Sequence, residues 1–307
     1  MVKHSRFDAR ALICQPFKYL LRFMRLARWM YVFLFAVACN RSDEDTVPAF
    51  IHVDSVGFST QALQGSNSSS ITELWVYSDG DILGVVDTPV SLPLLETGIQ
   101  TITVFAGIKN NGMGTSRIRY PFYTTYDTTL SITAGEEYDI KPSYAYVPNV
   151  SIDATRNFEA GNTFVASSTN SGSIELINDP LVAASGVRCV RMSLPPGAPL
   201  LSYLDETNIA LNAGEVAFME MDYSCNNTFV VGVFTIDGGN STKVPVLYLT
   251  PTQPEGDASP AWNKIYMDLG MIASQYPNTD NFRLYVECLS EEAAEPIVFL
   301  DDIKILK

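Results

Sequence analysis

From residue 50 onward, the chain alternates short apolar runs with polar breaks, and apolar residues at helical spacing are nearly absent. Many of the apolar residues are β-branched or aromatic, and the breaks are rich in Gly, Pro, Asn and Asp. The first group favours strands, whereas the second favours turns. The pattern therefore predicts an all-β fold.

The first half of this region predicts about seven strands. A tight hairpin is expected at Ser78-Asp79-Gly80-Asp81, because paired turn residues between apolar runs favour two-residue hairpin loops. The number and spacing of the strands predict an immunoglobulin-like β-sandwich over residues 47–146. The expected strands are 50–58, 71–77, 82–86, 90–95, 100–108, 128–132 and 138–142.

The second half predicts eight or nine strands with longer loops between them, which is typical of a jelly roll over residues 147–307. The chain of 307 residues is long enough for two such β-sandwich domains. The expected strands are 173–177, 189–194, 215–223, 229–236, 244–249, 262–268, 282–288 and 297–305.

The N-terminal segment predicts a signal peptide over residues 1–38. Residues 29–37 are continuously apolar and follow several basic residues, and this run is too short to span a bilayer. The residues Ala36-Val-Ala-Cys39 resemble the lipobox of bacterial lipoproteins, with Ala36 in place of the usual Leu. The resemblance implies cleavage before Cys39 and a covalent diacylglycerol and acyl anchor on it. An ordinary signal peptide is the alternative, because Ala36-x-Ala38 also fits the small-x-small cleavage rule.

Two further features of the N-terminal segment bear on localisation. Residues 1–23 make the leader unusually long, so they indicate either an upstream start codon, with Met24 as the true start, or an amphipathic leader helix. Residues 39–46 form the expected lipidated tether, and its acidic cluster resembles the surface-export signal of some Gram-negative lipoproteins. This predicts an outer-membrane protein exposed at the cell surface; a solvated linker is the alternative.

Charge excludes several classes of partner. The formal net charge is −14, and without residues 1–38 there remain 13 basic and 33 acidic residues, a charge of −20. Nucleic-acid binding needs a basic footprint, so it is not expected. His52 is the only histidine after the leader, which argues against a Ser-His-Asp triad and against multi-histidine metal sites. No catalytic residues are predicted.

The stretch 109–126 is a long insertion where a hairpin loop is expected. It carries Arg117 and Arg119, which are rare positive charges in an acidic chain, and the aromatic residues Tyr120 and Tyr123. Aromatic residues and arginine are enriched at interfaces, so these four residues, together with Trp262, are candidate ligand or partner contacts. The alternative is internal packing, of the loop on the second domain and of Trp262 in the core.

Two resemblances concern the domains themselves. The segment 76–105, with its Asp79-Gly80 hairpin, Pro89 and Gly98, resembles PEGA-type surface domains, which implies a scaffold. In the second half, an opening Phe158-Glu159, the segments 262–269 and 281–286, and the closing segment 299–305 together resemble galactose-binding-like jelly rolls and carbohydrate-binding modules.

The second resemblance implies a structural calcium ion. Its expected ligands are Glu159 and one of Asp301 and Asp302, with further oxygens from carbonyl groups or another acid. The alternative is that Asp301 and Asp302 flank an exposed strand end.

Three functional hypotheses follow. The first is a lipid-anchored, non-catalytic envelope protein whose jelly roll binds a glycan or a protein partner. The second is a structural or assembly component of an outer-membrane complex, with residues 109–126 as its contact surface. The third is a hydrolase with an unrecognised carboxylate site.

Overall fold

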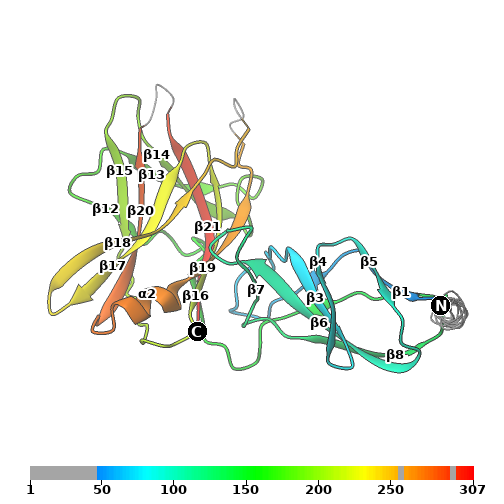
Figure 1. Cartoon of the computed structure of the whole chain (residues 1–307). Helices are drawn as coiled ribbons and strands as arrows, with labels where there is room; N and C mark the ends of the chain where they lie inside the picture. The colour runs from blue at the N-terminus through cyan, green and yellow to red at the C-terminus, as the bar shows by residue number, and fades with distance from the viewer. Residues whose placement is uncertain (1–46, 255–258, 291–294) are drawn as a thin grey trace, which may run out of the picture. The chain divides into compact units, whose positions relative to one another are not determined.

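The computed structural model describes residues 47–254, 259–290 and 295–307 (Figure 1). Residues Pro48–Lys307 form one compact unit of strands, and the described part of the chain contains one helix, α2 (Leu269–Gln275). The all-β prediction with sandwich sheets is confirmed. The predicted signal peptide, tether and lipidated Cys39 lie outside the described residues. No helix among the described residues is long and apolar enough to cross a membrane.

The first sandwich is organised around the long strand β6. The largest sheet has the order β4-β3-β6-β7, and β8 pairs with the N-terminal part of β6 on the side where β7 pairs with its C-terminal part. A three-stranded sheet β5-β1-β9 and a short pair β10-β2 complete it. The strands are β1 (Ala49–Val53), β2 (Gly57–Phe58), β3 (Glu73–Ser78), β4 (Asp81–Val86), β5 (Val90–Leu94), β6 (Gly98–Lys109), β7 (Arg117–Arg119), β8 (Tyr126–Ile132), β9 (Glu137–Asp139) and β10 (Ser143–Tyr144).

The second sandwich consists of two larger sheets. One has the order β13-β14-β21-β16-β19 with β11 paired to β21, and the other has the order β12-β15-β20-β17-β18. The strands are β11 (Ile152–Arg156), β12 (Phe164–Ala166), β13 (Ser173–Asn178), β14 (Arg188–Ser193), β15 (Leu200–Asp205), β16 (Phe218–Cys225), β17 (Phe229–Asp237), β18 (Asn240–Leu249), β19 (Asn263–Asp268), β20 (Asn281–Leu289) and β21 (Ile297–Leu306).

Two tight hairpins follow directly from the turn residues. Ser78 pairs with Asp81 across the predicted turn, in which Asp79 and Gly80 have φ values of 47° and 93°. Two successive positive φ values define the hairpin turn that matches the right-handed twist of strands. Gly238 and Gly239, with φ values of 53° and 90°, join β17 to β18 in the same way.

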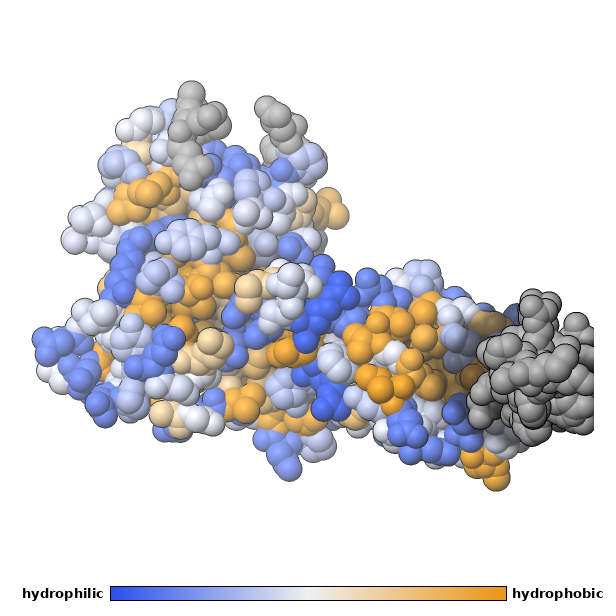
Figure 2. Space-filling model, in the orientation of Figure 1, coloured by the Kyte–Doolittle hydropathy of each residue, from blue (hydrophilic) through white to orange (hydrophobic). Residues whose placement is uncertain are grey.

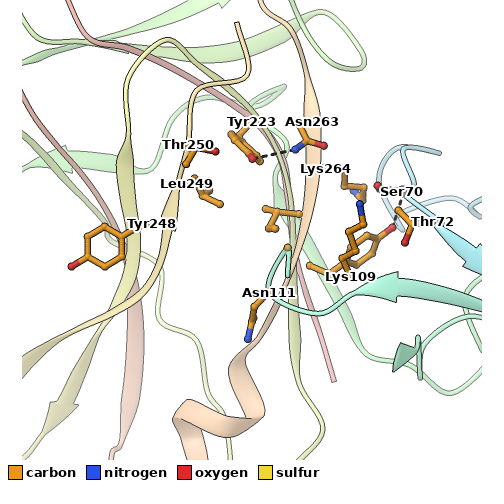
Figure 3. A pocket seen from close by; sticks show the side chains of 13 residues that line it. Ser70, Thr72, Lys109, Asn111, Tyr223, Tyr248, Leu249, Thr250, Asn263 and Lys264 are labelled. Atoms are coloured by element: carbon orange, nitrogen blue, oxygen red, sulfur yellow. Dashed lines mark hydrogen bonds between the residues drawn. The ribbon is translucent and has the colours of Figure 1, made fainter. Parts of the chain in front are cut away.

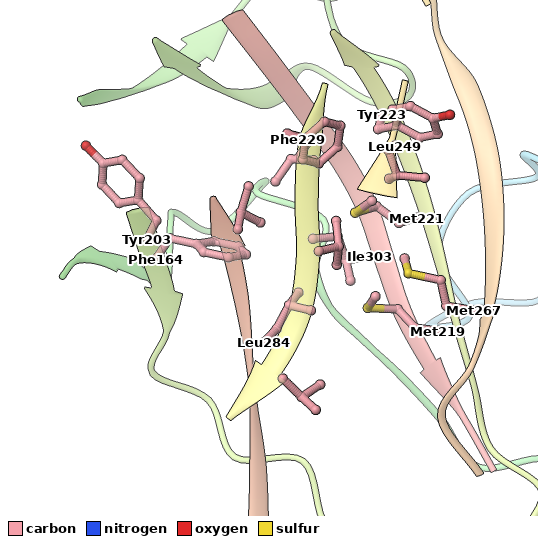
Figure 4. Close-up of a cluster of buried hydrophobic side chains, with 14 of the residues drawn as sticks. Phe164, Tyr203, Met219, Met221, Tyr223, Phe229, Leu249, Met267, Leu284 and Ile303 are labelled. Atoms are coloured by element: carbon pink, nitrogen blue, oxygen red, sulfur yellow. The ribbon is translucent and has the colours of Figure 1, made fainter. Parts of the chain in front are cut away.

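The core of the second sandwich lies between its two sheets (Figure 4). Alternate residues of each strand point inward, as Met219 and Met221 of β16 and Leu284 of β20 do. Each such side chain, when fully buried, stabilises the fold by roughly 1.5–3 kcal/mol. The cysteines of this sandwich, Cys189, Cys225 and Cys288, are all buried.

Candidate functional site

One outer face of the second sandwich is covered. Every residue of β16 is buried, although only alternate residues, including Met219 and Met221, face the core. The residues between them, including Phe218, Glu220 and Asp222, point to the opposite side, where the first sandwich packs. The first sandwich therefore covers this sheet around β16, whereas Arg191 of β14 and Glu175 of β13, on the same sheet, keep side chains that are 29% and 65% exposed.

Charged groups lie inside this contact. The two carboxylate oxygens of Glu220 accept hydrogen bonds from the hydroxyls of Tyr120, at 2.8 Å, and Tyr146, at 2.7 Å. The Nζ atom of Lys264 lies 3.4 Å from Glu220 Oε2 and 3.6 Å from Asp222 Oδ2. A buried charge is tolerated when opposite charges and hydrogen bonds surround it, so the first sandwich supplies the donors that Glu220 requires.

Lys304 of β21 belongs to the same contact and is fully buried. Its ammonium group donates to the backbone carbonyl of Ser66, at 2.7 Å, and lies 5.3 Å from the ring centre of Tyr146. Gly65 has a φ of 81°, and a Cβ atom there would lie 2.6 Å from Lys304 Cε, so the loop covers Lys304 only with glycine at this position. Burial and the nearby charge of Lys264 lower the pKa of Lys304 to about 8.

The aromatic residues of the 109–126 segment are part of this contact. Tyr120 and Tyr123 are only 4% and 6% exposed. The hydroxyls of Tyr123 and Tyr266 lie 2.9 Å apart, and burial and Glu220 raise the pKa values of Tyr120 and Tyr123 well above normal. The structure therefore corrects the interpretation of Tyr120 and Tyr123 as external contacts: their rings pack on the second sandwich, which was the alternative.

The outer face of the sheet β12-β15-β20-β17-β18 is the face that the first sandwich leaves free, and we call it the open face. On β17 and β20, the residues that alternate with the core residues point outward to this face. Figure 2 shows hydrophobic residues flanked by hydrophilic ones over β17, β18 and β20. The side chains of the open face include Ser202, Phe234, Lys243, Tyr248, Arg283, Tyr285 and Glu287.

An aromatic pair forms the floor of the open face, although Tyr285 is only 2% exposed and supports this face from below rather than offering its ring to a ligand. The ring centres of Phe234 and Tyr285 lie 5.3 Å apart at an interplanar angle of 60°. The ring of Tyr285 crosses the backbone of Gly232, where a Cβ atom would come within 2.4 Å of ring atoms. Gly232 therefore allows the ring to lie close to the sheet, and burial and Glu287 raise the pKa of Tyr285 to about 12.

Polar groups surround this floor. Lys243 pairs with Glu287 and lies 4.7 Å above the ring centre of Tyr285. The hydroxyl of Ser202 donates to Glu287 Oε1 at 2.7 Å. Tyr248 of β18 pairs with Val230 and is 69% exposed. The open face thus combines the exposed ring of Tyr248 with fixed donors and acceptors, which is the composition of ligand sites in general.

A polar cavity of about 290 Å³ lies beside the open face, where both sandwiches contribute residues (Figure 3). Lys109 and Asn111 line it from the first sandwich, whereas Asn263 and Lys264 line it from the second. Tyr248 lines this cavity and also belongs to the open face.

The remaining predicted contact residues, Trp262, Arg117 and Arg119, lie on different sandwiches. Trp262 precedes β19, is half-buried, donates its indole N–H to the carbonyl of Val182 at 2.9 Å and packs edge-to-face on Phe299. Arg117 and Arg119 are both exposed on β7. Arg117 pairs with Asp87 at 3.2 Å, whereas Arg119 stacks on aromatic rings. The structure does not bring these residues together with Trp262 in one site.

The residues of the predicted calcium site accept hydrogen bonds from the protein itself. Glu159 Oε1 accepts from the backbone N–H groups of Val187 and Arg188, at 2.7 and 2.9 Å, and Asp301 Oδ2 accepts from two backbone N–H groups. Burial and the charge of Asp302 raise the pKa of Asp301 to about 8. In the parts of the chain that are described, no three His, Cys, Asp or Glu side chains gather as a metal-binding group. The calcium site stays a prediction.

Phe234 and Tyr285 are not among the contacts predicted from the sequence. Phe234 stands in a strand where residues on both sides are apolar, so the pattern does not show which side faces solvent. The strand of Tyr285 does alternate, and its polar residues Arg283 and Glu287 lie on the same side as Tyr285. The signal that was available is Gly232 within a β-branched strand, because an isolated strand glycine marks a close approach.

Comparisons with known proteins concern the fold. No protein-family model and no curated protein matches the sequence. Among solved structures, one that describes the promiscuous specificity of carbohydrate-binding modules of the β-sandwich superfamily matches with 12% identity and a TM-score of 0.37, covering 76% of this chain and 84% of that chain. The family 11 carbohydrate-binding module of a cellulosomal cellulase of Clostridium thermocellum has 11% identity and a TM-score of 0.34, covering 50% and 94%.

A third similar structure belongs to a different class of protein. The enzymatically active domain of tailspike protein 4 of bacteriophage CBA120 has 10% identity and a TM-score of 0.31, covering 52% of this chain and 20% of that chain.

The buried charges of Glu220 and Lys264 predict a large stability effect for Glu220→Gln. The substitution keeps the shape but leaves Lys264 without one of its two carboxylate partners, so we expect a loss of about 3 kcal/mol in the free energy of unfolding, measured in urea. The matched control is Asp87→Asn, which breaks the exposed pair with Arg117 and should cost less than about 1 kcal/mol. If both substitutions lowered the free energy of unfolding by the same amount, the buried charges would not stabilise the fold more than an exposed pair does.

Lys304 predicts a pH dependence of stability. The pKa of Lys304 falls from 10.5 to about 8 on folding, so between these values the folded chain binds fewer protons than the unfolded chain. The free energy of unfolding then rises with pH in this window. We expect the wild type to gain about 2–3 kcal/mol relative to Lys304→Met between pH 7.5 and 10 in urea unfolding. A constant difference between the two proteins would refute the lowered pKa.

Proposed function

We propose that this protein is a non-catalytic envelope protein that binds a glycan on the open face of its second sandwich. The observation that carries the proposal is the pairing of a covered face with an open one. The open face presents the exposed ring of Tyr248 beside the Phe234–Tyr285 floor, while the first sandwich covers the part of the opposite face around β16.

The chemistry of the open face suits sugars. A pyranose ring has apolar C–H surfaces that pack on aromatic rings, and its hydroxyls both donate and accept hydrogen bonds. Tyr248 supplies an accessible ring, and Lys243, Arg283 and Glu287 supply charged donors and acceptors around it. Glu287 is already oriented by Ser202 and Lys243, so its position is set before a ligand arrives.

The similar solved structures include carbohydrate-binding modules. Their TM-scores lie below 0.5, so the open face, and not this likeness, carries the proposal.

The envelope location rests on the N-terminal segment. The lipobox-like residues Ala36-Val-Ala-Cys39 support cleavage before Cys39 and a lipid anchor on it, and several acyl chains hold a protein on a membrane persistently. The acidic tether supports exposure at the cell surface. The outer membrane is the proposed location on these grounds.

The alternative, a component of an outer-membrane complex, needs a contact surface on residues 109–126. The main aromatic residues of this segment are engaged inside the protein, so the surface that remains is smaller than the sequence indicates. For this reason glycan binding is the preferred function.

Glycan binding on the open face predicts that Tyr248→Ala loses affinity for a neutral polysaccharide. We expect the full-length chain to be retarded in affinity electrophoresis by at least one neutral polysaccharide from a panel of β-glucan, xylan, mannan and cellulose derivatives. Tyr248→Ala should weaken this binding at least tenfold, because it removes the exposed stacking ring. The control Tyr77→Ala removes a tyrosine of the first sandwich and should bind normally. Retardation by none of the polysaccharides would remove the glycan proposal.

The anchor predicts that Cys39→Ser releases the protein from membranes, because serine cannot take the thioether-linked lipid. The measurement is the fraction of the chain that sediments with membranes after a carbonate wash. Cys225→Ser, which changes a buried cysteine of the core, should sediment like the wild type. Continued sedimentation of the Cys39→Ser protein would contradict lipid anchoring.

A further inference from the structure

Arg119 is held in place by aromatic rings on the first sandwich. It lies on β7, and its guanidinium carbon is 4.7 Å from the ring centre of Phe105 and 5.9 Å from that of Trp75. Stacking of a planar guanidinium on aromatic faces restricts its orientation while leaving its N–H groups free to donate. The side chain is therefore pre-organised.

No group of the described chain uses these donors. Among the residues that the structure describes, the guanidinium group of Arg119 has no hydrogen-bond or ion-pair partner. Its neighbour Arg117 differs, because it pairs with Asp87 at 3.2 Å and donates to the carbonyl of Gly114 at 3.1 Å. Of these two exposed arginines on one short strand, Arg117 has a carboxylate partner and Arg119 has none. An unpaired arginine is unexpected in a chain with so many acidic residues.

Arg119 forms one wall of a cleft of about 680 Å³. The volume falls within the range of small-molecule sites. The other lining residues include Phe105, Pro121, Thr124, Val147 and Pro148. The Thr124 hydroxyl oxygen accepts the N–H of Ala145 at 3.1 Å, so its O–H remains available to donate. We call this site the Arg119 cleft.

The lining indicates which ligand fits. Pro121 and Pro148 have no N–H group, so the cleft offers an extended peptide a poor strand edge for backbone pairing. Their rings and Val147 instead present flat apolar surface, beside a threonine hydroxyl and a guanidinium. A sugar ring matches the surface and the hydroxyl, and a carboxylate matches the guanidinium in planar, two-point geometry.

We propose that the Arg119 cleft binds an acidic oligosaccharide, with the carboxylate of a uronate residue on Arg119. This site lies on the first sandwich and is independent of the open face, so either can fail without the other. The net negative charge of the protein opposes an anionic ligand at long range, but salt screens that repulsion beyond about 8 Å at physiological ionic strength. The local contact with Arg119 is screened less.

The test is calorimetric titration of the full-length chain with trigalacturonate and with its methyl ester, which keeps the sugar but removes the charge. We expect Arg119→Gln to weaken trigalacturonate binding at least tenfold and Arg117→Gln to change it less than twofold. The wild type should bind the methyl ester at least tenfold more weakly than the acid. Arg119→Gln should not weaken binding of the methyl ester further. Esterification of the ligand and substitution of Arg119 each remove the same carboxylate–guanidinium interaction.

Two controls distinguish binding in the Arg119 cleft from binding on the open face and from a loss of folding. Tyr248→Ala should bind trigalacturonate normally, whereas Arg119→Gln should bind the neutral polysaccharide of the open face normally. If Arg119→Gln lowers the melting temperature by more than a few degrees, Arg119→Lys replaces it, and we expect a loss of at least threefold because the two-point contact is gone. The proposal is overturned if trigalacturonate does not bind, if Arg119→Gln binds it like the wild type, or if triglutamate binds instead.

Discussion

The structure depends on a layer of buried charge between the two sandwiches. Glu220, Asp222, Lys264 and Lys304 project from one sheet of the second sandwich, and all four are buried. Removing such groups from water costs several kcal/mol for each ion, and only opposite charges and hydrogen bonds in good geometry offset this cost. The first sandwich supplies part of the compensation, through the hydroxyls of Tyr120 and Tyr146 and the carbonyl of Ser66.

This layer determines where a ligand can bind. A sheet that carries carboxylates and ammonium groups on its outer face could serve as a ligand surface in an isolated jelly roll. Here the groups are occupied, and the loop that contains Gly65 lies against Lys304. The edge strand β19 is also engaged, since Asn111 N donates to Tyr266 O at 2.9 Å, which protects one point of an otherwise free strand edge. The opposite sheet keeps an accessible outer face, on which Tyr248 is 69% exposed.

The strands themselves could be predicted from the sequence, because each is a local pattern closed by turn residues. The hairpin at Asp79-Gly80 is an example, since its two positive φ values follow from residue type alone. The burial of both sides of β16 could not be predicted. Its segment Phe-Met-Glu-Met-Asp-Tyr-Ser-Cys has apolar and polar residues in alternation, and such a pattern normally indicates one solvated face. The polar side is buried because tyrosines 74 and 100 residues earlier in the chain provide its hydrogen bonds, and no local rule contains that information.

The two proposed sites share a construction and differ in one respect that affects their selectivity. In each, a cation lies 4.7 Å above an aromatic ring, Lys243 over Tyr285 and Arg119 over Phe105. Lys243 is neutralised by Glu287, so a ligand on the open face meets a balanced pair and gains little from carrying charge. Arg119 has no such partner in the described chain, so a neutral ligand would leave its charge uncompensated. The same cation–π arrangement therefore favours neutral sugars on the second sandwich and acidic sugars on the first, because the carboxylate is built into one site and must come from the ligand in the other.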